Sequence, residues 1–115
     1  MAKFDLRRKV QTAGIGTVGI FMEEFIHAYE KWHGERGSKA EYIRWFHDEY
    51  GKNMRWDFDS TKTKCYAMME IIEQHRVLDA LDLVLNSNDK KVEEEAFENA
   101  GSLLDKIIDD QIVLP

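Results

Sequence analysis

The chain has 115 residues, of which 43% are hydrophobic and 33% are charged, with seven glycines and one proline. These values fit one globular domain over residues 1–115 and exclude a collagen-like or low-complexity chain. The formal net charge is −6. A net negative charge argues against a protein whose whole surface binds nucleic acid.

Acidic and basic residues are unevenly distributed along the chain. Residues 1–30 carry four of each sign, and residues 31–65 carry eight bases and six acids. Residues 66–115 carry twelve acids and four bases, which gives this segment a charge of −8. Acidity is therefore concentrated in the C-terminal half, and the middle of the chain is slightly basic.

Residues 1–16 leave two alternatives open. Phe4, Leu6 and Val10 have the spacing of a short helix. Residues 12–19 have the composition of a flexible hinge, because glycine recurs within them. The first segment is therefore expected either as a short helix or as a flexible N-terminal segment.

The apolar residues of the first half recur at helical spacing. Six of them in residues 17–33 fall on one side of a helix: Val18, Phe21, Met22, Phe25, Tyr29 and Trp32. This spacing predicts one amphipathic helix, which Gly34 and Gly37 end. Ser38 followed by Glu41 is a capping-box pattern, so a second helix is expected from Ser38 to about Tyr50.

The remaining helices follow a connection at residues 52–59. Polar and apolar side chains alternate there over too short a run to define a strand, so we predict an ordered loop. Asp59 or Ser60 is expected to cap the next helix. The apolar stripe of that helix is interrupted at residues 74–76, where either one helix bends or two helices meet. A last helix, with an acidic start, follows the turn at residues 86–89.

These elements together predict an all-α fold. Short connections between helices indicate a compact bundle or an orthogonal array of four to five helices. The apolar stretch from Ala13 to Met22 contains three glycines and is too short to span a membrane. The single cysteine, Cys65, has no partner for an internal disulfide. The short apolar stretch and the unpaired cysteine together predict a cytoplasmic protein that does not insert into membranes.

Three short motifs have both a functional and a structural interpretation. Residues 14–19 match the G-x-G-x-x-G turn that binds dinucleotides, but no parallel sheet is predicted around them, which favours a hinge or a close helix contact. Glu24 and His27 have the E-x-x-H spacing of a di-iron site without its second copy. Residues 57–61 match the D-x-D-x-T of aspartate-nucleophile phosphatases without the α/β sheet, so a turn and helix cap is preferred.

Histidines and aspartates offer a candidate metal site. The pair His47-Asp48, taken with His27 or His33 and with Asp79 or Asp82, resembles the metal-dependent HD phosphohydrolases. That resemblance implies a divalent metal ion that activates water. No cofactor and no metal belong to the primary prediction, and a metal-dependent phosphohydrolase with His27, His47, Asp48 and Asp79 as ligands is kept as an alternative.

The middle of the chain mixes basic and aromatic side chains. Within residues 32–64 this composition suits a surface that holds phosphates and stacks bases. An aromatic core surrounded by amphipathic bases explains the same composition and is preferred. Binding of nucleic acid through residues 32–64 is therefore a second alternative function.

The primary expectation is a non-enzymatic helical module that binds another protein or a protein–nucleic acid complex. A regulator or inhibitor of the type found in mobile elements fits the acidic second half, because dense carboxylates suit a basic groove. Eight residues are the candidate contacts: Trp32, Trp45, Trp56, Arg44, Arg55, Glu93, Glu94 and Glu95. A homodimer in which a copy covers an apolar face is a further expectation.

Overall fold

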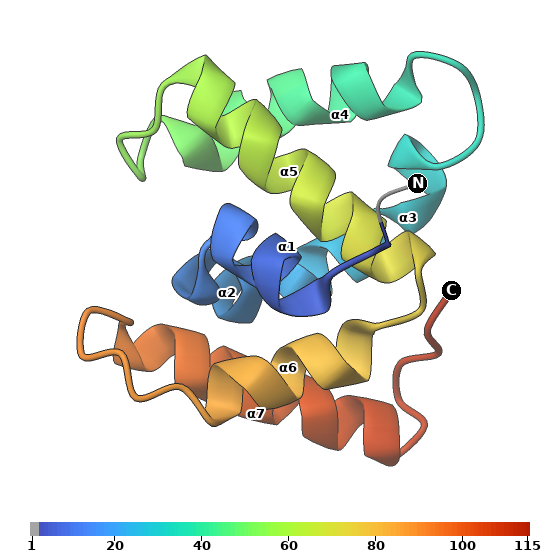
Figure 1. Ribbon diagram of the computed structural model, residues 1–115. Coiled ribbons are helices and arrows are strands. Elements are labelled where there is room, and N and C mark those ends of the chain that lie inside the picture. Colours follow the sequence, from blue (N-terminus) through green and yellow to red (C-terminus); the bar gives the residue numbers. More distant parts are fainter. Residues whose placement is uncertain (1–2) are drawn as a thin grey trace.

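The structure is a computed structural model that describes residues 3–115. Within these residues it contains seven α-helices, one π-helical turn and no strand (Figure 1). The elements are α1 (Leu6–Ala13), α2 (Ile15–His27), α3 (Tyr29–Trp32), α4 (Ser38–Phe46), η1 (His47–Gly51), α5 (Phe58–Glu73), α6 (Val77–Leu85) and α7 (Glu94–Ile108). The all-α prediction is confirmed, and the predicted number of four to five helices is wrong.

The helix predicted over residues 17–33 is divided at Ala28 into α2 and α3. The indole nitrogen of Trp32 donates a hydrogen bond of 2.9 Å to the carbonyl oxygen of Phe25. An uninterrupted helix would offer that carbonyl to the amide of Tyr29. The buried indole therefore replaces a backbone donor at the point where the helix turns.

The predicted capping box at Ser38 does not form. Ser38 is the first residue of α4, and Gly37, with φ of +90°, takes the cap position. The Ser38 hydroxyl instead lies 2.8 Å from the carbonyl oxygen of Trp32 and 2.7 Å from that of Glu35. Ser38 thus fastens the loop after α3 onto the end of that helix.

The prediction that Asp59 or Ser60 caps α5 is wrong, because the cap is Asp57, two residues before Asp59. The Asp57 carboxylate accepts a hydrogen bond of 2.7 Å from the Ser60 amide, so the helix starts at Phe58. Residues 52–57 form no strand, as predicted. At residues 74–76 two helices meet, and His75 there adopts a positive φ of 58°.

Helix α2 lies at the centre, between α4 and α5 on one side and α6 and α7 on the other (Figure 1). One buried cluster of apolar side chains extends from α1 to α7. Helix α1 packs against α5, and its Val10 and Ala13 belong to this cluster. In residues 3–115 no helix combines the length and the apolar character that crossing a membrane requires.

Close contact between α2 and α7 depends on Gly19. A Cβ atom at this position would lie 2.5 Å from the backbone carbonyl oxygen of Ala96. No real side chain tolerates that distance, so the two helices approach as closely as they do only because residue 19 is glycine. This contact accounts for the last glycine of the G-x-G-x-x-G pattern, in keeping with its structural interpretation.

Candidate interaction surface

The three tryptophans have different environments. Trp32 is fully buried, so it belongs to the core and the expectation that it anchors a partner at the surface is wrong. Trp45 is 42% exposed, and Trp56 is half-buried. Only Trp45 and Trp56 therefore present ring surface to a partner.

Trp45, Tyr50, Met54 and Trp56 are exposed or partly exposed and are here named the aromatic edge. The ring centroids of Trp45 and Tyr50 are 6.0 Å apart. Phe21, from α2 beneath them, connects Tyr50 at 5.3 Å with Trp56 at 6.0 Å. Met54 is exposed beside Trp56. The aromatic edge is thus the outer margin of the ring cluster in the core.

The π-helical turn η1 positions the middle of the aromatic edge. Nδ1 of His47 and Oγ1 of Thr61 lie 2.7 Å apart, which joins η1 to the buried side of α5. A Cβ atom at Gly51 would lie 2.5 Å from His47 Nδ1, so this turn requires glycine. A π-helical turn contains one more residue per turn than an α-helix and so changes the direction of the side chains within it. Here the Tyr50 ring packs against Phe21 and Phe46.

Lys64 supports Trp56 from α5. Its ammonium nitrogen lies 5.1 Å from the centroid of the Trp56 ring and donates a hydrogen bond of 3.0 Å to the carbonyl oxygen of Ala13. Partial burial lowers the pKa of Lys64 below the ordinary lysine value. Lys64 therefore connects the end of α1 with the Trp56 ring.

A hollow of about 450 Å³, here named the Trp56 hollow, adjoins the aromatic edge. Its apolar lining includes Met54 and Trp56 from one side and Ile15, Ile20 and Val92 from the other. The loop before α7 contributes charged side chains to the lining: Asp89, Lys91 and Glu93. The lining of the hollow is therefore mostly apolar, and it also contains Gln11, Thr17 and charges of both signs.

Two groups of candidate residues from distant parts of the sequence meet at this hollow. Trp56 comes from the loop before α5, and Glu93 precedes α7. Glu94 and Glu95 follow Glu93 and are exposed in the first turn of α7. Met54 and Tyr50 also belong to the surface but were not among the candidate residues. The alternation at residues 54–58 was a signal for Met54.

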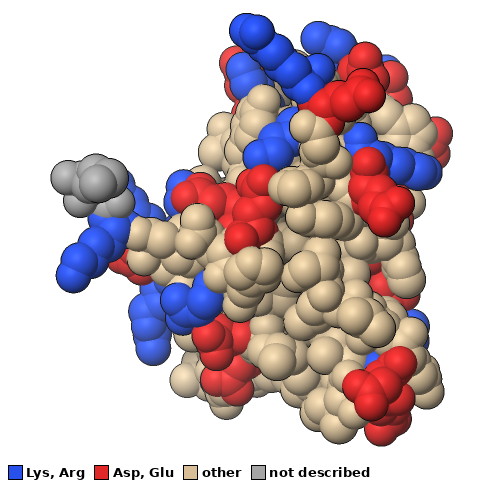
Figure 2. Space-filling model, turned by 90° about the vertical axis from the view of Figure 1, so that its right-hand side faces the viewer, with Lys and Arg blue, Asp and Glu red and all other residues tan. Residues whose placement is uncertain are grey.

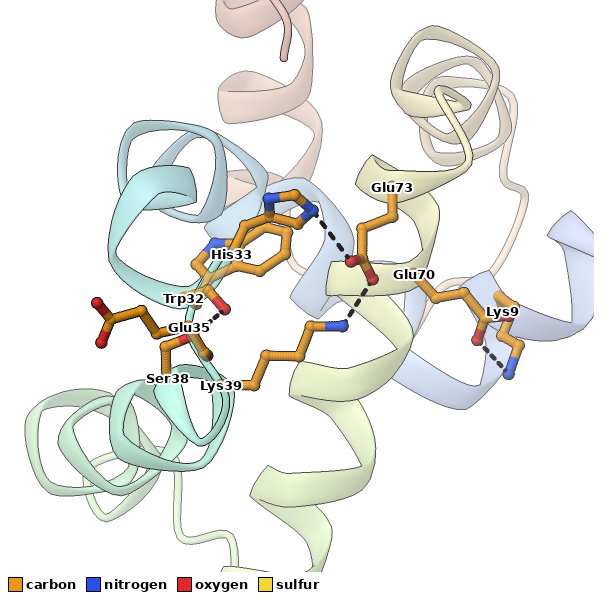
Figure 3. Close-up of polar contacts among 8 residues, drawn as sticks. All are labelled: Lys9, Trp32, His33, Glu35, Ser38, Lys39, Glu70 and Glu73. Atoms are coloured by element: carbon orange, nitrogen blue, oxygen red, sulfur yellow. Dashed lines mark hydrogen bonds and ion pairs between the residues drawn. The ribbon is translucent and has the colours of Figure 1, made fainter.

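The basic side chains of residues 32–64 are partly engaged within the protein. Lys39 forms an ion pair of 2.8 Å with Glu73, which also lies 3.7 Å from Nε2 of His33 (Figure 3). Lys52 pairs with Asp48 at 3.0 Å. Arg44 and Arg55 are exposed. Arg44 and Arg55 are therefore exposed in a segment in which Lys39, Lys52 and Lys64 contact groups of the same chain.

The residues of the HD-like pattern are not assembled into a site. His27 lies 3.6 Å from Glu23, and Asp79 accepts a hydrogen bond of 2.8 Å from Arg76. His47 contacts Thr61, and its neighbour Asp48 contacts Lys52. Over the part of the chain that the structure describes, no three His, Cys, Asp or Glu side chains converge to hold a metal ion. The histidine of the E-x-x-H motif, His27, thus contacts Glu23 at the surface.

Two ionisable groups behind the aromatic edge are buried. Burial raises the pKa of the Cys65 thiol to about 12, so the thiol is protonated and unreactive at neutral pH. Burial, reinforced by the negative charge of Glu24, also raises the pKa of the Tyr42 hydroxyl. Both groups therefore belong to the packed interior and supply no nucleophile.

Comparison with known proteins gives no relative from which to infer a function: no protein-family model, curated protein or solved structure matches this chain.

Proposed function

We propose that this protein is a non-enzymatic interaction module that binds another protein through the aromatic edge and the Trp56 hollow. The observation that supports this proposal is the hollow itself, in which an aromatic anchor, an exposed methionine and a carboxylate border one apolar depression. Interfaces draw most of their binding free energy from rings and flexible apolar side chains packed into such depressions, with charged groups at the rim.

The charges around the hollow indicate the chemistry of the partner. Glu93 lines the hollow, and Glu94 and Glu95 follow it as exposed acids. The whole chain carries a charge of −6. A partner surface with a basic rim around an apolar projection fits this arrangement. Acidic proteins that occupy basic grooves commonly act as regulators or inhibitors, and this is the class we propose.

Affinity capture tests the proposal. The tagged chain is used to recover proteins from a lysate of its native cells, with and without nuclease treatment. We expect one stoichiometric protein that survives the nuclease. The double variant Trp56→Ala, Glu93→Lys should lose it, because the variant removes both the anchor and the adjacent charge.

Tyr66→Ala with Asp105→Lys is the matched control, because it removes one exposed ring and reverses one exposed acid outside the hollow. The control should capture the partner as the parent chain does. Equal capture by all three proteins would contradict the assignment of the hollow. Recovery that depends on nucleic acid and is lost in Arg44→Glu would instead favour binding through residues 32–64.

A further inference from the structure

The start of helix α2 faces the Trp56 hollow, which residues 14–17 line. The first three amides of the helix, at Ile15, Gly16 and Thr17, precede its first backbone hydrogen bond, which the Val18 amide donates to the carbonyl oxygen of Gly14. No side chain of residues 3–115 caps these amides. Unpaired amides at the positive end of a helix are donors that suit an anion.

The Thr17 hydroxyl is a further donor without a partner. The residue is only 7% exposed, and its hydroxyl forms no hydrogen bond with residues 3–115. A buried helical threonine commonly donates to the carbonyl four residues earlier, but here that carbonyl, of Ala13, accepts from Lys64 instead. Oγ1 of Thr17 points back along the helix, since it lies 3.4 Å from where a Cβ of Gly14 would be. The hydroxyl is thus directed towards the start of α2.

Gly14 leaves a space between this hydroxyl and the ammonium group of Lys64. Gly14 has a φ of +96°, and a Cβ atom there would lie 3.2 Å from Nζ of Lys64. Nζ donates one hydrogen bond, to Ala13, and has two further protons to donate. At Gly16 a Cβ would meet no atom within 4 Å, so the approach to the amides is open. Amide, hydroxyl and ammonium donors therefore meet at this end of α2.

Positive and negative charges near these donors balance one another. Lys64 and Lys91 supply the positive charges, and Asp89 and Glu93 supply the negative charges. The Asp89 carboxylate accepts a hydrogen bond of 2.9 Å from the Lys91 amide. An anion at the start of α2 is therefore held by directed hydrogen bonds and not by a net positive charge.

On another side of the molecule, basic side chains stand beside acidic ones. Figure 2 shows this for the side on which both chain ends lie in Figure 1. Lys9 pairs there with Glu70 at 2.8 Å, and Lys39 pairs with Glu73 at 2.8 Å. These lysines already have carboxylate partners, whereas the donors at the start of α2 have hydrogen bonds left to give.

We propose that the start of α2 is a binding site for a phosphate group. Phosphate oxygens accept several hydrogen bonds at once, which matches the amide, hydroxyl and ammonium donors there. The apolar lining of the hollow, which includes Met54 and Trp56, leaves room for an organic group that carries the phosphate. Helix α1 and not a strand precedes Gly14, so this is not the dinucleotide turn of a parallel sheet. The inference does not depend on the proposed function, because it concerns the chain without a partner protein.

NMR titration of the purified, nitrogen-15-labelled protein with inorganic phosphate tests the site. We expect saturable shifts of the amide signals of residues 15–17, because these amides donate to the bound phosphate. Sodium chloride at the same ionic strength should leave the signals in place, since it supplies the same screening without a phosphate. Equal shifts with both salts, or no saturable shift at residues 15–17, would overturn the proposal.

Two variants test the side-chain donors. Thr17→Val keeps the shape of the buried side chain and removes the hydroxyl, so it should weaken phosphate binding about tenfold. Lys64→Met removes the ammonium group and keeps an unbranched side chain, and its effect should be similar. Thr63→Val and Lys62→Met make the same changes at exposed positions of α5 and should bind like the parent chain. Unchanged affinity in Thr17→Val and Lys64→Met would overturn the proposal.

A nucleoside monophosphate distinguishes free phosphate from phosphate carried by an organic group. If an organic group carries it, adenosine monophosphate should bind more tightly than inorganic phosphate and should also shift the indole N–H signal of Trp56. Equal affinities with an unchanged Trp56 signal would assign the site to free phosphate. A shift of Trp56 by the nucleotide, with residues 15–17 unaffected, would contradict a phosphate site at α2.

Discussion

The two faces of α2 pack in different ways. Phe21 and Phe25 point towards α4 and η1, and their ring centroids lie 5.0 to 5.4 Å from those of Tyr42, Phe46 and Tyr50. On the opposite face Gly19 lies against the backbone of Ala96, and the helices nearly touch. Aromatic rings thus separate α2 from its neighbours on one face, and on the other face a glycine allows the backbone of α7 to come close.

This difference explains where the candidate surface lies. Aromatic side chains are too large for a chain of this size to bury all of them, so the ring cluster continues to the surface as Trp45, Tyr50 and Trp56. The Gly19 contact has the complementary role, because it lets the start of α7 approach the start of α2. Glu93 and Val92 are thereby placed opposite Trp56. Both packing modes are needed to form the hollow.

The largest effect is expected on the aromatic side. Trp32→Ala should lower the free energy of unfolding by about 3–5 kcal/mol, because it empties a fully buried site. Trp45→Ala should cost less than about 1.5 kcal/mol, since that ring is partly solvated. Chemical denaturation of both variants measures the contrast. Equal losses would show that burial does not distinguish the two tryptophans.

On the other side of α2, two glycines should respond with opposite signs. Gly19→Ala should cost roughly 1–3 kcal/mol, because its Cβ meets the Ala96 backbone. Gly101→Ala in α7 meets no atom within 4 Å and should stabilise the fold by about 0.5–1 kcal/mol. Thermal unfolding measures both. A neutral Gly19→Ala would disprove the close helix contact.

The hydrogen bond between η1 and α5 should contribute less to the free energy of unfolding than the packing of Trp32 or the helix contact at Gly19. Thr61→Val keeps the shape of the buried side chain and removes the hydroxyl that lies 2.7 Å from His47. The loss should be about 1–2 kcal/mol, because the imidazole nitrogen is left without its partner. Denaturation measures the loss, and Thr63→Val, at an exposed position of α5, is the control. An equal response in the two variants would rule out the His47 contact as the cause.

The smallest effect concerns alkaline pH. Burial raises the pKa of Cys65 from 9.0 to about 12, so the folded state keeps a proton that the unfolded state loses above pH 9. Stability should therefore fall by about 1 kcal/mol between pH 9 and pH 10 through this group. Cys65→Ala should show a shallower fall over the same window in denaturant titrations. Parallel slopes would mean that the thiol ionises alike in both states.

Sequence periodicity was sufficient for the helical class because apolar stripes at residues 17–33, 60–72 and 94–108 correspond to buried helix faces. Periodicity did not predict the backbone conformation where that conformation depends on a side-chain contact. The break at Ala28 depends on the Trp32 indole, and η1 depends on His47, Gly51 and Thr61 meeting across two helices. Neither contact leaves a periodic signal.

The candidate surface was predictable only in its parts. Trp56 and Glu93 could be named from residue type and charge alone, because tryptophans are frequent anchors at interfaces and the acidic start of the last helix is visible in the sequence. Their proximity depends on the packing of α7 against α2, which a glycine in an otherwise unremarkable helix permits. Trp32 was misassigned because a tryptophan on an apolar stripe has the same spacing whether it faces a partner or the core.

Hydrogen exchange of the chain bound to its captured partner, compared with the free chain, tests the central claim most directly. We predict new protection in residues 50–56 and 89–95, the two segments that meet at the Trp56 hollow, with the free and bound forms alike in α6. Protection confined to other elements, with residues 50–56 and 89–95 exchanging as in the free chain, would contradict the account.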